Sequence, residues 1–163
     1  MKASSHSPRI TLQIISGGQT GADRAALDWA IAHHLPQGGW CPHGRLAEDG
    51  TIPRRYELKE TPLPDYAQRT EWNVRDADAT VIFSIAATLA GGSLFTLELA
   101  RSHHKPCLHL ARSVHAGNAA KQLHAFLVQH HVRVLNVAGP RASQEPEVGV
   151  FVQETLEQAW RLG

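Results

Sequence analysis

The chain has 163 residues, and domains typically contain about 100–200 residues, so we expect a single domain spanning 1–163. Hydrophobic residues make up 42% and charged residues 19% of the chain, close to globular averages, which excludes a disordered or fibrous protein. Sixteen Lys and Arg against fifteen Asp and Glu give a net charge of +1. No overall positive field therefore favours nucleic-acid binding, and we expect no nucleic-acid partner.

The numbers and positions of the cysteines and histidines bear on disulfide bonds and metal sites. Cys41 and Cys107 cannot form a disulfide framework, and the eleven histidines are scattered or occur as adjacent pairs, which do not share a helix face. We therefore expect no metal site made by the protein itself. The apolar run at 10–15 is too short for a secretion signal or a membrane span. We expect a cytoplasmic protein without membrane contact, with 1–9 as a flexible N-terminus.

The first part of the chain reads as a strand, a helix and a turn-rich segment. A strand is predicted over 10–15, which is rich in β-branched residues and ends at Gly17-Gly18. Apolar residues at helical spacing predict a helix over 22–34, and Pro36 ends it. Residues 36–66 contain frequent Pro and Gly without a sustained period. This composition predicts a long, turn-rich insertion, and such loops are usually functional or mobile.

The middle of the chain holds a polar helix, a strand and a second glycine pair. The polar helix is predicted from about 66 to 76, and the strand over 79–84. Gly91-Gly92 then precedes a helix predicted over 94–104, for which Ser93 is the candidate N-cap.

The last part continues the alternation of strands and helices. We predict a strand over 107–110, a helix over 116–130, a strand over 132–137 and, after a Pro/Gly loop, a helix over 148–161. Such alternation predicts parallel strands with right-handed crossovers and helices on both faces. The predicted fold class is therefore α/β, a three-layer Rossmann-like domain. Ligands of such sheets bind at the carboxyl ends of the strands, where both glycine pairs fall.

The first glycine-rich loop runs from Ser16 to Gly21 between a strand and a helix. Its glycines allow a tight turn in which backbone N–H groups approach an oxygen-rich ligand, and the helix adds its positive dipole end. The loop lacks the first glycine and the acidic residue of the dinucleotide fingerprint, and it has no Walker A Lys-Ser/Thr pair. The alternative interpretation is a capping box, with Thr20 as N-cap and Asp23 three residues later.

The second junction is Gly91-Gly92-Ser93, with Thr96 and Glu98 in the helix that follows. Alone, such a segment is more often a turn than a site. Two glycine-rich junctions after two strands of one parallel sheet would face each other across one crevice. Glu98, one turn into the helix, faces either that crevice or solvent.

The polar helix offers a second group of candidates. Helical spacing places Arg69, Asn73 and Asp76 on one face. One interpretation is a solvated surface helix with ion pairs such as Glu71–Arg75. The other is that Arg69 and Asn73 form a fork-and-amide clamp for an anion or for a purine- or pterin-like edge.

The insertion contributes Trp40 for stacking and Arg45 for phosphate pairing. The alternative for Trp40 is that it fills the core beneath a loop. The sequence leaves open whether 42–66 closes over a ligand or packs on the sheet.

Three segments carry a specific resemblance to a known family: Ser16-Gly-Gly-Gln-Thr-Gly-Ala-Asp-Arg-Ala-Ala-Leu-Asp-Trp-Ala30, Gly39-Trp-Cys-Pro-His-Gly-Arg45 with Ala47-Glu-Asp-Gly50, and Tyr66-Ala-Gln-Arg-Thr-Glu-Trp-Asn-Val-Arg-Asp76. They look like the putative molybdenum carrier family, which is similar to molybdenum cofactor carrier proteins and lies within the LOG/YpsA-like Rossmann superfamily. The resemblance covers the chain from about Ile10 to the last helix. It implies a mainly parallel sheet of about five strands and a homo-oligomer, a dimer or tetramer. It also implies an anionic nucleotide- or pterin-type ligand over the glycine loops.

Two functional hypotheses follow. The first is a carrier that holds molybdenum cofactor or a similar phosphorylated pterin or nucleotide, a ligand that brings its own dithiolene, so that the protein needs no metal ligands. The ligand-binding candidates are Gly17, Gly18, Gln19, Thr20, Gly21, Arg24, Trp40, Arg45, Arg69, Asn73, Gly91, Gly92, Ser93 and Thr96. The alternative is a LOG-like phosphoribohydrolase acting on nucleoside 5′-monophosphates, with Glu98 acting at the glycosidic bond. The chain departs from the LOG pattern P-G-G-x-G-T-x-x-E, since Ala90 replaces the proline and Glu98 lies only two residues after Thr96.

Overall fold

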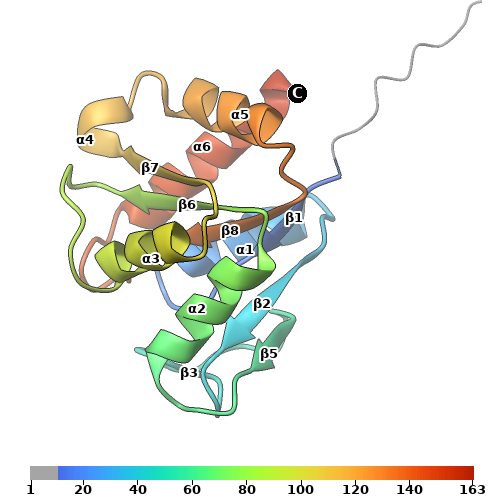
Figure 1. The fold of residues 1–163 in the computed structure, drawn as a ribbon, viewed down its shortest axis with the longest axis vertical. Coiled ribbons are helices and arrows are strands. Elements are labelled where there is room, and N and C mark those ends of the chain that lie inside the picture. Colours follow the sequence, from blue (N-terminus) through green and yellow to red (C-terminus); the bar gives the residue numbers. More distant parts are fainter. Residues whose placement is uncertain (1–10) are drawn as a thin grey trace, which may run out of the picture.

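The structure is a computed structural model that describes residues 11–163. Residues 1–10, which include the expected flexible terminus and the start of the first predicted strand, lie outside the described residues. The central sheet has six strands, all paired in parallel, in the order β5-β2-β1-β8-β6-β7 (Figure 1). Its strands are β1 Gln13–Ile15, β2 Gln37–Cys41, β5 Leu58–Glu60, β6 Ala79–Ser84, β7 Cys107–Ala111 and β8 Val134–Ala138. The short strands β3 Leu46–Ala47 and β4 Gly50–Thr51 form a separate antiparallel hairpin.

Helices cover both faces of this sheet, which confirms the predicted α/β Rossmann-like class (Figure 1). The helices are α1 Ala22–Ala32, α2 Tyr66–Asp76, α3 Gly91–Ser102, α4 Arg112–His115, α5 Ala119–Gln129 and α6 Val148–Leu162. Packing contacts join α1, α5 and α6 on one face and α2 with α3 on the other. Every residue of β6 is buried, as expected for a strand that is covered on both faces.

The order of the strands places a topological switch point at β1 and β8. The chain passes from β1 outward to β2 and β5, crosses to β6 and β7, and then returns to insert β8 between β1 and β6. The loops that follow β1 and β6 lead to helices on opposite faces of the sheet, α1 and α3, and β8 lies between these two strands. In open parallel sheets the crevice at such a point is the usual place for a ligand.

The largest difference from the sequence prediction concerns residues 36–66. This segment was expected to be a turn-rich insertion, but it contributes β2 and β5 to the sheet, which has six strands rather than about five. The glycines that suggested turns are required inside β2 by close packing. Gly39 has a φ of +121°, and a Cβ on it would lie 2.3 Å from the carbonyl oxygen of Ser16 in the neighbouring chain segment. The glycines of β2 interrupt the alternating pattern by which a strand is predicted, and they also allow β2 to pack closely against its neighbours.

One predicted helix start is wrong, and one capping alternative is excluded. Helix α3 begins at Gly91, so Ser93 lies inside the first turn, and the N-cap is Ala90, which has no side-chain acceptor. Helix α1 is capped by Gly21 without a side-chain hydrogen bond, which excludes the capping box. The Thr20 hydroxyl instead accepts a hydrogen bond from the Ala142 amide at 3.1 Å. The helix predicted over 116–130 is observed as α5, which begins three residues later, and the short helix α4 before it was not predicted.

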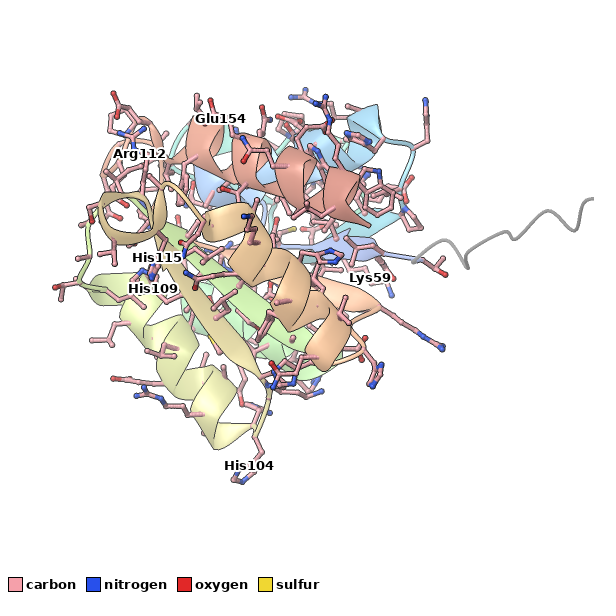
Figure 2. All side chains as sticks on the ribbon, turned by 90° about the horizontal axis from the view of Figure 1, so that it is seen from above. Lys59, His104, His109, Arg112, His115 and Glu154 are labelled. Atoms are coloured by element: carbon pink, nitrogen blue, oxygen red, sulfur yellow. The ribbon has the colours of Figure 1, made fainter. Side chains whose placement is uncertain are left out.

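Three helices end in the same way, on a pair of histidines. In α1, α3 and α5 the first histidine is the C-cap and the second has a left-handed φ near +50°: the pairs are His33-His34, His103-His104 and His130-His131. Figure 2 shows His104 at the end of α3, pointing away from the fold. A left-handed residue at this position is usually Gly, because a Cβ is strained there. The paired histidines are thus helix-end residues.

Candidate functional site

A cavity of about 280 Å³ lies at the carboxyl edge of the sheet, at the switch point. It is lined by the loop after β1, the first turn of α1, helix α2, the first turns of α3, and the end of β8 with the loop that follows it. Both glycine-rich junctions thus open onto one cavity. Of the residues singled out from the sequence, those that line it are Gly17, Gln19, Arg69, Asn73, Gly92, Ser93 and Thr96.

The three glycines of the first loop serve packing in three directions. Gly17 lies against Arg69, since a Cβ on it would fall 2.4 Å from Arg69 Nη1. Gly18, with φ of +75°, would direct a Cβ to within 2.4 Å of Leu58 Cδ1, which belongs to the core rather than to the cavity. Gly21 would place one 2.5 Å from the carbonyl oxygen of Pro140. Only Gly17 borders the cavity directly.

The amides of this loop are largely satisfied within the protein. The amide of Gln19 donates to Asp23 Oδ2 at 3.2 Å, that of Thr20 to Gln19 Oε1 at 3.0 Å, and that of Gly18 to Ser16 Oγ at 3.4 Å. The expected cradle of free amides over 17–21 is therefore not available at these three positions. The carboxylate of Asp23, from the first turn of α1, takes the acceptor role that the sequence had assigned to a ligand.

Gln19 carries the clearest indication of a missing partner. Its Oε1 accepts from the amides of Thr20 and Glu48, at 3.0 and 2.9 Å, which fixes the orientation of the side-chain amide. Its Nε2 is buried at the cavity and has no partner among the described residues. A buried donor without an acceptor costs about 1–3 kcal/mol. A ligand that supplies an oxygen acceptor would recover this cost.

Two guanidinium groups contribute positive charge. Arg69 is 8% exposed and donates from Nη1 to the carbonyl oxygen of Gly17 at 2.8 Å and from Nε to Thr70 Oγ1 at 3.3 Å. Arg141 comes from the loop after β8. The two guanidinium carbons lie 5.0 and 5.5 Å from the ring centre of Tyr66, which itself lines the cavity. Tyr66 and Phe95 are each 38% exposed there, an aromatic surface beside the two cations.

Asp23 is the acid of this cavity. Burial raises the pKa of its carboxyl from the ordinary 3.8 to about 6, although Arg69, the amides of Gln19 and Gly17, and Arg24 act in the opposite direction. The group is therefore ionised at neutral pH and becomes neutral in mild acid. A titratable acid beside two arginines makes the charge of the cavity depend on pH.

The first turn of α3 adds a second source of positive potential. Gly92 and Ser93 line the cavity, and the N-cap Ala90 offers no side-chain acceptor to the amides of this turn. Such amides carry the positive end of the helix dipole. The arginines, Gln19 Nε2 and this helix terminus converge on the same space, so the cavity favours oxygen atoms that carry negative charge.

Several predicted candidates have structural partners instead. Asn73 lines the cavity, but its amide pairs with the backbone of Trp40, accepting from the N–H at 2.8 Å and donating to the carbonyl at 2.9 Å. Trp40 packs edge-on against Trp72 and donates from Nε1 to Asp76 at 2.7 Å, outside the cavity lining. Asn73 therefore connects β2 to α2. Asp76, predicted on the same face of α2, accepts a hydrogen bond from Trp40.

The remaining candidates lie away from the cavity lining. Arg45 is 9% exposed, and its guanidinium donates to four backbone carbonyls of residues 52–58. Arg24 donates to the carbonyl oxygen of Gly18 and to the carboxylate of Asp49. Glu98 is exposed on α3. These residues, with Gly18, Thr20, Gly21 and Gly91, do not line the cavity.

The β3–β4 hairpin makes hydrogen bonds to the two loops that line the cavity, without lining it. Glu48, between the two strands, accepts from the hydroxyl groups of Thr20 and Ser143 and from the amide of Ser143. Its own amide donates to Gln19 Oε1. The hairpin thereby joins the loop after β1 to the loop after β8 and fixes the Gln19 amide. Its side chains at 46–51 are not part of the lining.

Comparison with known proteins assigns the chain to a family. The sequence profile of the circularly permutated YpsA SLOG family matches residues 14–160. The chain belongs to this family. A crystal structure described as that of a putative molybdenum carrier protein from Syntrophus aciditrophicus SB has a sequence 51% identical to the chain. The two structures superpose with a TM-score of 0.87, over 93% of this chain and 96% of the other. No curated protein matches the sequence significantly.

Within the described residues of this SLOG-family member, no group of three or more His, Cys, Asp or Glu is placed to hold a metal ion. None of the helices in residues 11–163 is long and apolar enough to cross a membrane.

Sequence reasoning missed part of the cavity. It treated Asp23 only as a capping residue, and it gave no role to the loop after β8, which contributes Gly139, Arg141 and Gln144. One sequence feature could have found this loop. Gly139-Pro140 directly follows a predicted strand, as the two recognised glycine pairs do, and parallel strands end at the same edge of a sheet.

Proposed function

We propose that the protein is a carrier that binds a small anionic ligand, molybdenum cofactor or a similar phosphorylated pterin or nucleotide, in the cavity at the carboxyl edge of the sheet. The observation that carries the proposal is Gln19 Nε2, a buried donor fixed in orientation and without a partner, at a cavity that also holds Arg69 and Arg141. The description of the 51% identical neighbour as a putative molybdenum carrier protein supports the choice of ligand.

The residues of the cavity divide between the two ends of such a ligand. Arg69, Arg141, Gln19 Nε2 and the first turn of α3 bind the phosphate, because charge-assisted and dipole-assisted donors suit an oxyanion. The half-exposed rings of Tyr66 and Phe95 contact the flat heterocycle. Ligand pockets commonly measure about 300–1,000 Å³, so a cavity of about 280 Å³ suits the phosphate and part of a ring. The remainder of a larger ligand stays outside.

Molybdenum, in this proposal, belongs to the cargo. The cofactor supplies the dithiolene sulfurs that hold the metal, and the protein supplies donors for the phosphate and aromatic surface for the pterin.

A carrier fits the cavity better than a phosphoribohydrolase. The hydrolase hypothesis placed Glu98 at the glycosidic bond, but Glu98 is exposed and outside the lining. General acid–base catalysis requires a group within hydrogen-bonding reach of the reacting atoms. An assay for free base released from AMP tests this alternative. Release that depends on Glu98 would replace the carrier proposal with the hydrolase.

Binding measurements test the site. We expect Arg141→Gln to weaken the binding of AMP or of a phosphorylated pterin about tenfold or more in isothermal titration calorimetry, because a hydrogen bond to a charged group is worth about 1.5–3 kcal/mol. Arg54→Gln is the matched control, since Arg54 is exposed and outside the cavity lining. Equal affinities in both variants and the unaltered protein would place the anion elsewhere.

The cargo and the assembly need separate measurements. Protein purified from cells that make molybdenum cofactor should contain molybdenum and pterin fluorescence, and their absence would argue against this cargo. The homo-oligomer implied by the family resemblance, a dimer or tetramer, is part of the proposal, and light scattering after gel filtration measures it. A cytoplasmic location likewise stays a prediction.

A further inference from the structure

The cavity combines donors for an anion with one carboxyl group that would oppose an anion. Asp23 extends from the first turn of α1 and lines the same space as Arg69, Arg141 and the unpartnered Gln19 Nε2. A site that only collected negative charge would gain from a neutral residue at this position. The carboxyl therefore needs an explanation in terms of the ligand that the cavity takes.

The surroundings of Asp23 leave it able to accept from a ligand. Its Oδ2 accepts from the amide of Gln19 at 3.2 Å. The charged groups that act on it are Arg69 from α2 and Arg24 from its own helix, together with the amides of Gln19 and Gly17. An ionised carboxylate has about four acceptor positions, so the loop amides occupy only part of its capacity. Asp23 itself lines the cavity, within reach of a ligand there.

Two anions of equal charge and shape interact differently with this carboxylate if only one of them carries a hydrogen that it can donate. An oxyanion without a proton places its lone pairs against the lone pairs of Asp23, and one of the two groups must take up a proton from solvent. An anion that carries an O–H, or a heterocycle that carries an N–H, donates that hydrogen to the carboxylate instead. Leaving a buried charge unpaired is far more costly than pairing it.

We propose that Asp23 is a specificity-determining residue that admits ligands carrying an O–H or N–H donor beside their negative charge and rejects proton-free oxyanions, free molybdate and sulfate among them, at neutral and alkaline pH. This inference rests on the proposed function and narrows it. The cargo is an organic phosphate with its own hydrogen-bond donors, and the metal does not enter as the bare oxyanion.

The proton balance of binding makes this inference quantitative. Hydrogen phosphate brings its own proton, which lies between the phosphate oxygen and Asp23, so no proton is taken from solvent. Sulfate brings none, so its complex takes up one proton. With the pKa of Asp23 raised to about 6, the affinity for sulfate should fall about tenfold for each pH unit above that value.

The experiment compares inorganic phosphate and sulfate by isothermal titration calorimetry from pH 5.5 to pH 8. At pH 8, two units above the pKa of about 6, we expect phosphate to bind about 100-fold more tightly than sulfate. Repeating the sulfate titration in buffers of different ionisation enthalpy should show uptake of one proton. These measurements need only the unaltered protein, so they do not depend on a variant that folds.

Two variants assign the effect to Asp23. Asp23→Asn should bind sulfate at pH 8 with the affinity that the unaltered protein reaches only near pH 5.5, and should lose the pH dependence. Glu98→Gln is the matched control, because it neutralises an exposed acid outside the cavity lining, and it should retain both the preference and the pH dependence.

The outcomes separate this inference from the proposed function. Equal binding of phosphate and sulfate at pH 8, without proton uptake, would overturn the proposed selectivity of Asp23. The proposed anion site would still be supported. A preference that survives in Asp23→Asn would assign it to another group and also overturn the inference. Binding of neither anion at any pH would overturn the anion site and the selectivity together.

Discussion

Replacing Asp23 by Asn should change the stability of the protein in a pH-dependent way. The pKa of this carboxyl is raised from 3.8 to about 6 by burial, a shift of about two units, and each unit corresponds to 1.36 kcal/mol. Well below pH 3.8 the group is protonated in the folded and the unfolded chain, and its burial then carries no ionisation cost. As the pH rises through 6, the unfolded chain has already released this proton, so the folded state loses about 3 kcal/mol relative to acid conditions.

Asn removes the ionisation and keeps a side-chain oxygen that can accept from the Gln19 amide. We therefore expect the stability of Asp23→Asn relative to the unaltered protein to rise by about 2 kcal/mol between pH 4 and pH 7.5, because at pH 4 the carboxyl of the unfolded chain is already partly ionised. Urea unfolding of both proteins at pH 4, 5, 6 and 7.5 measures this difference. Taking the difference between the two proteins removes the contribution of other acids, such as Asp76, whose pKa is lowered by Arg75.

The reasoning would be refuted if the difference between the two proteins did not change with pH. A change of the opposite sign, in which Asp23→Asn became relatively less stable above pH 6, would mean that interactions with Arg69 and the loop amides outweigh the cost of burying the charge.

Two further substitutions test the packing around the cavity and the helix ends. Gly17→Ala should displace Arg69, because the new Cβ would lie 2.4 Å from Nη1, and should lower anion affinity about tenfold or more; retained affinity in calorimetry would show that the guanidinium position does not matter. His104→Gly should raise stability by about 1 kcal/mol, because a left-handed φ of +53° strains any residue with a Cβ. A lower melting temperature than that of the unaltered protein would contradict this account of the helix end.

The location of the candidate site followed from sequence with few assumptions. Gly17-Gly18 and Gly91-Gly92 each come after a predicted strand, and parallel strands end at one edge, so both junctions were expected to face one crevice. The structure places Gly17 and Gly92 in the lining of one cavity. Element type was also predictable where a helical period was long, as in α2, and where a run of β-branched and apolar residues was continuous, as in β6. Strands β2 and β5 could not be predicted, because they are short. In addition, β2 contains two glycines, which are required only because neighbouring chain segments pack closely against them in the folded protein.

The arginines show why residue roles were harder to predict. Arg45 was proposed to pair with phosphate, and Arg69, together with Asn73, to clamp an anion or a purine- or pterin-like edge. In the structure Arg45 donates to four carbonyls within residues 52–58, whereas Arg69 borders the cavity. The difference depends on which carbonyl groups come within 3.1 Å of each guanidinium, and no local pattern records that.

The sequence by itself therefore determined the α/β class, the edge of the sheet at which a ligand would bind and two of the loops that border the cavity, because strand periodicity and glycine position are local properties of the chain. Only the tertiary structure decided which donors remain for a ligand. Gln19 Nε2 lacks a partner because Glu48, distant in sequence, orients the amide. The pKa of Asp23 is raised to about 6 because the fold buries the carboxyl, although Arg69 acts in the opposite direction. Hydrogen-bond satisfaction and desolvation depend on everything that surrounds a group, so they exist only once the chain has folded.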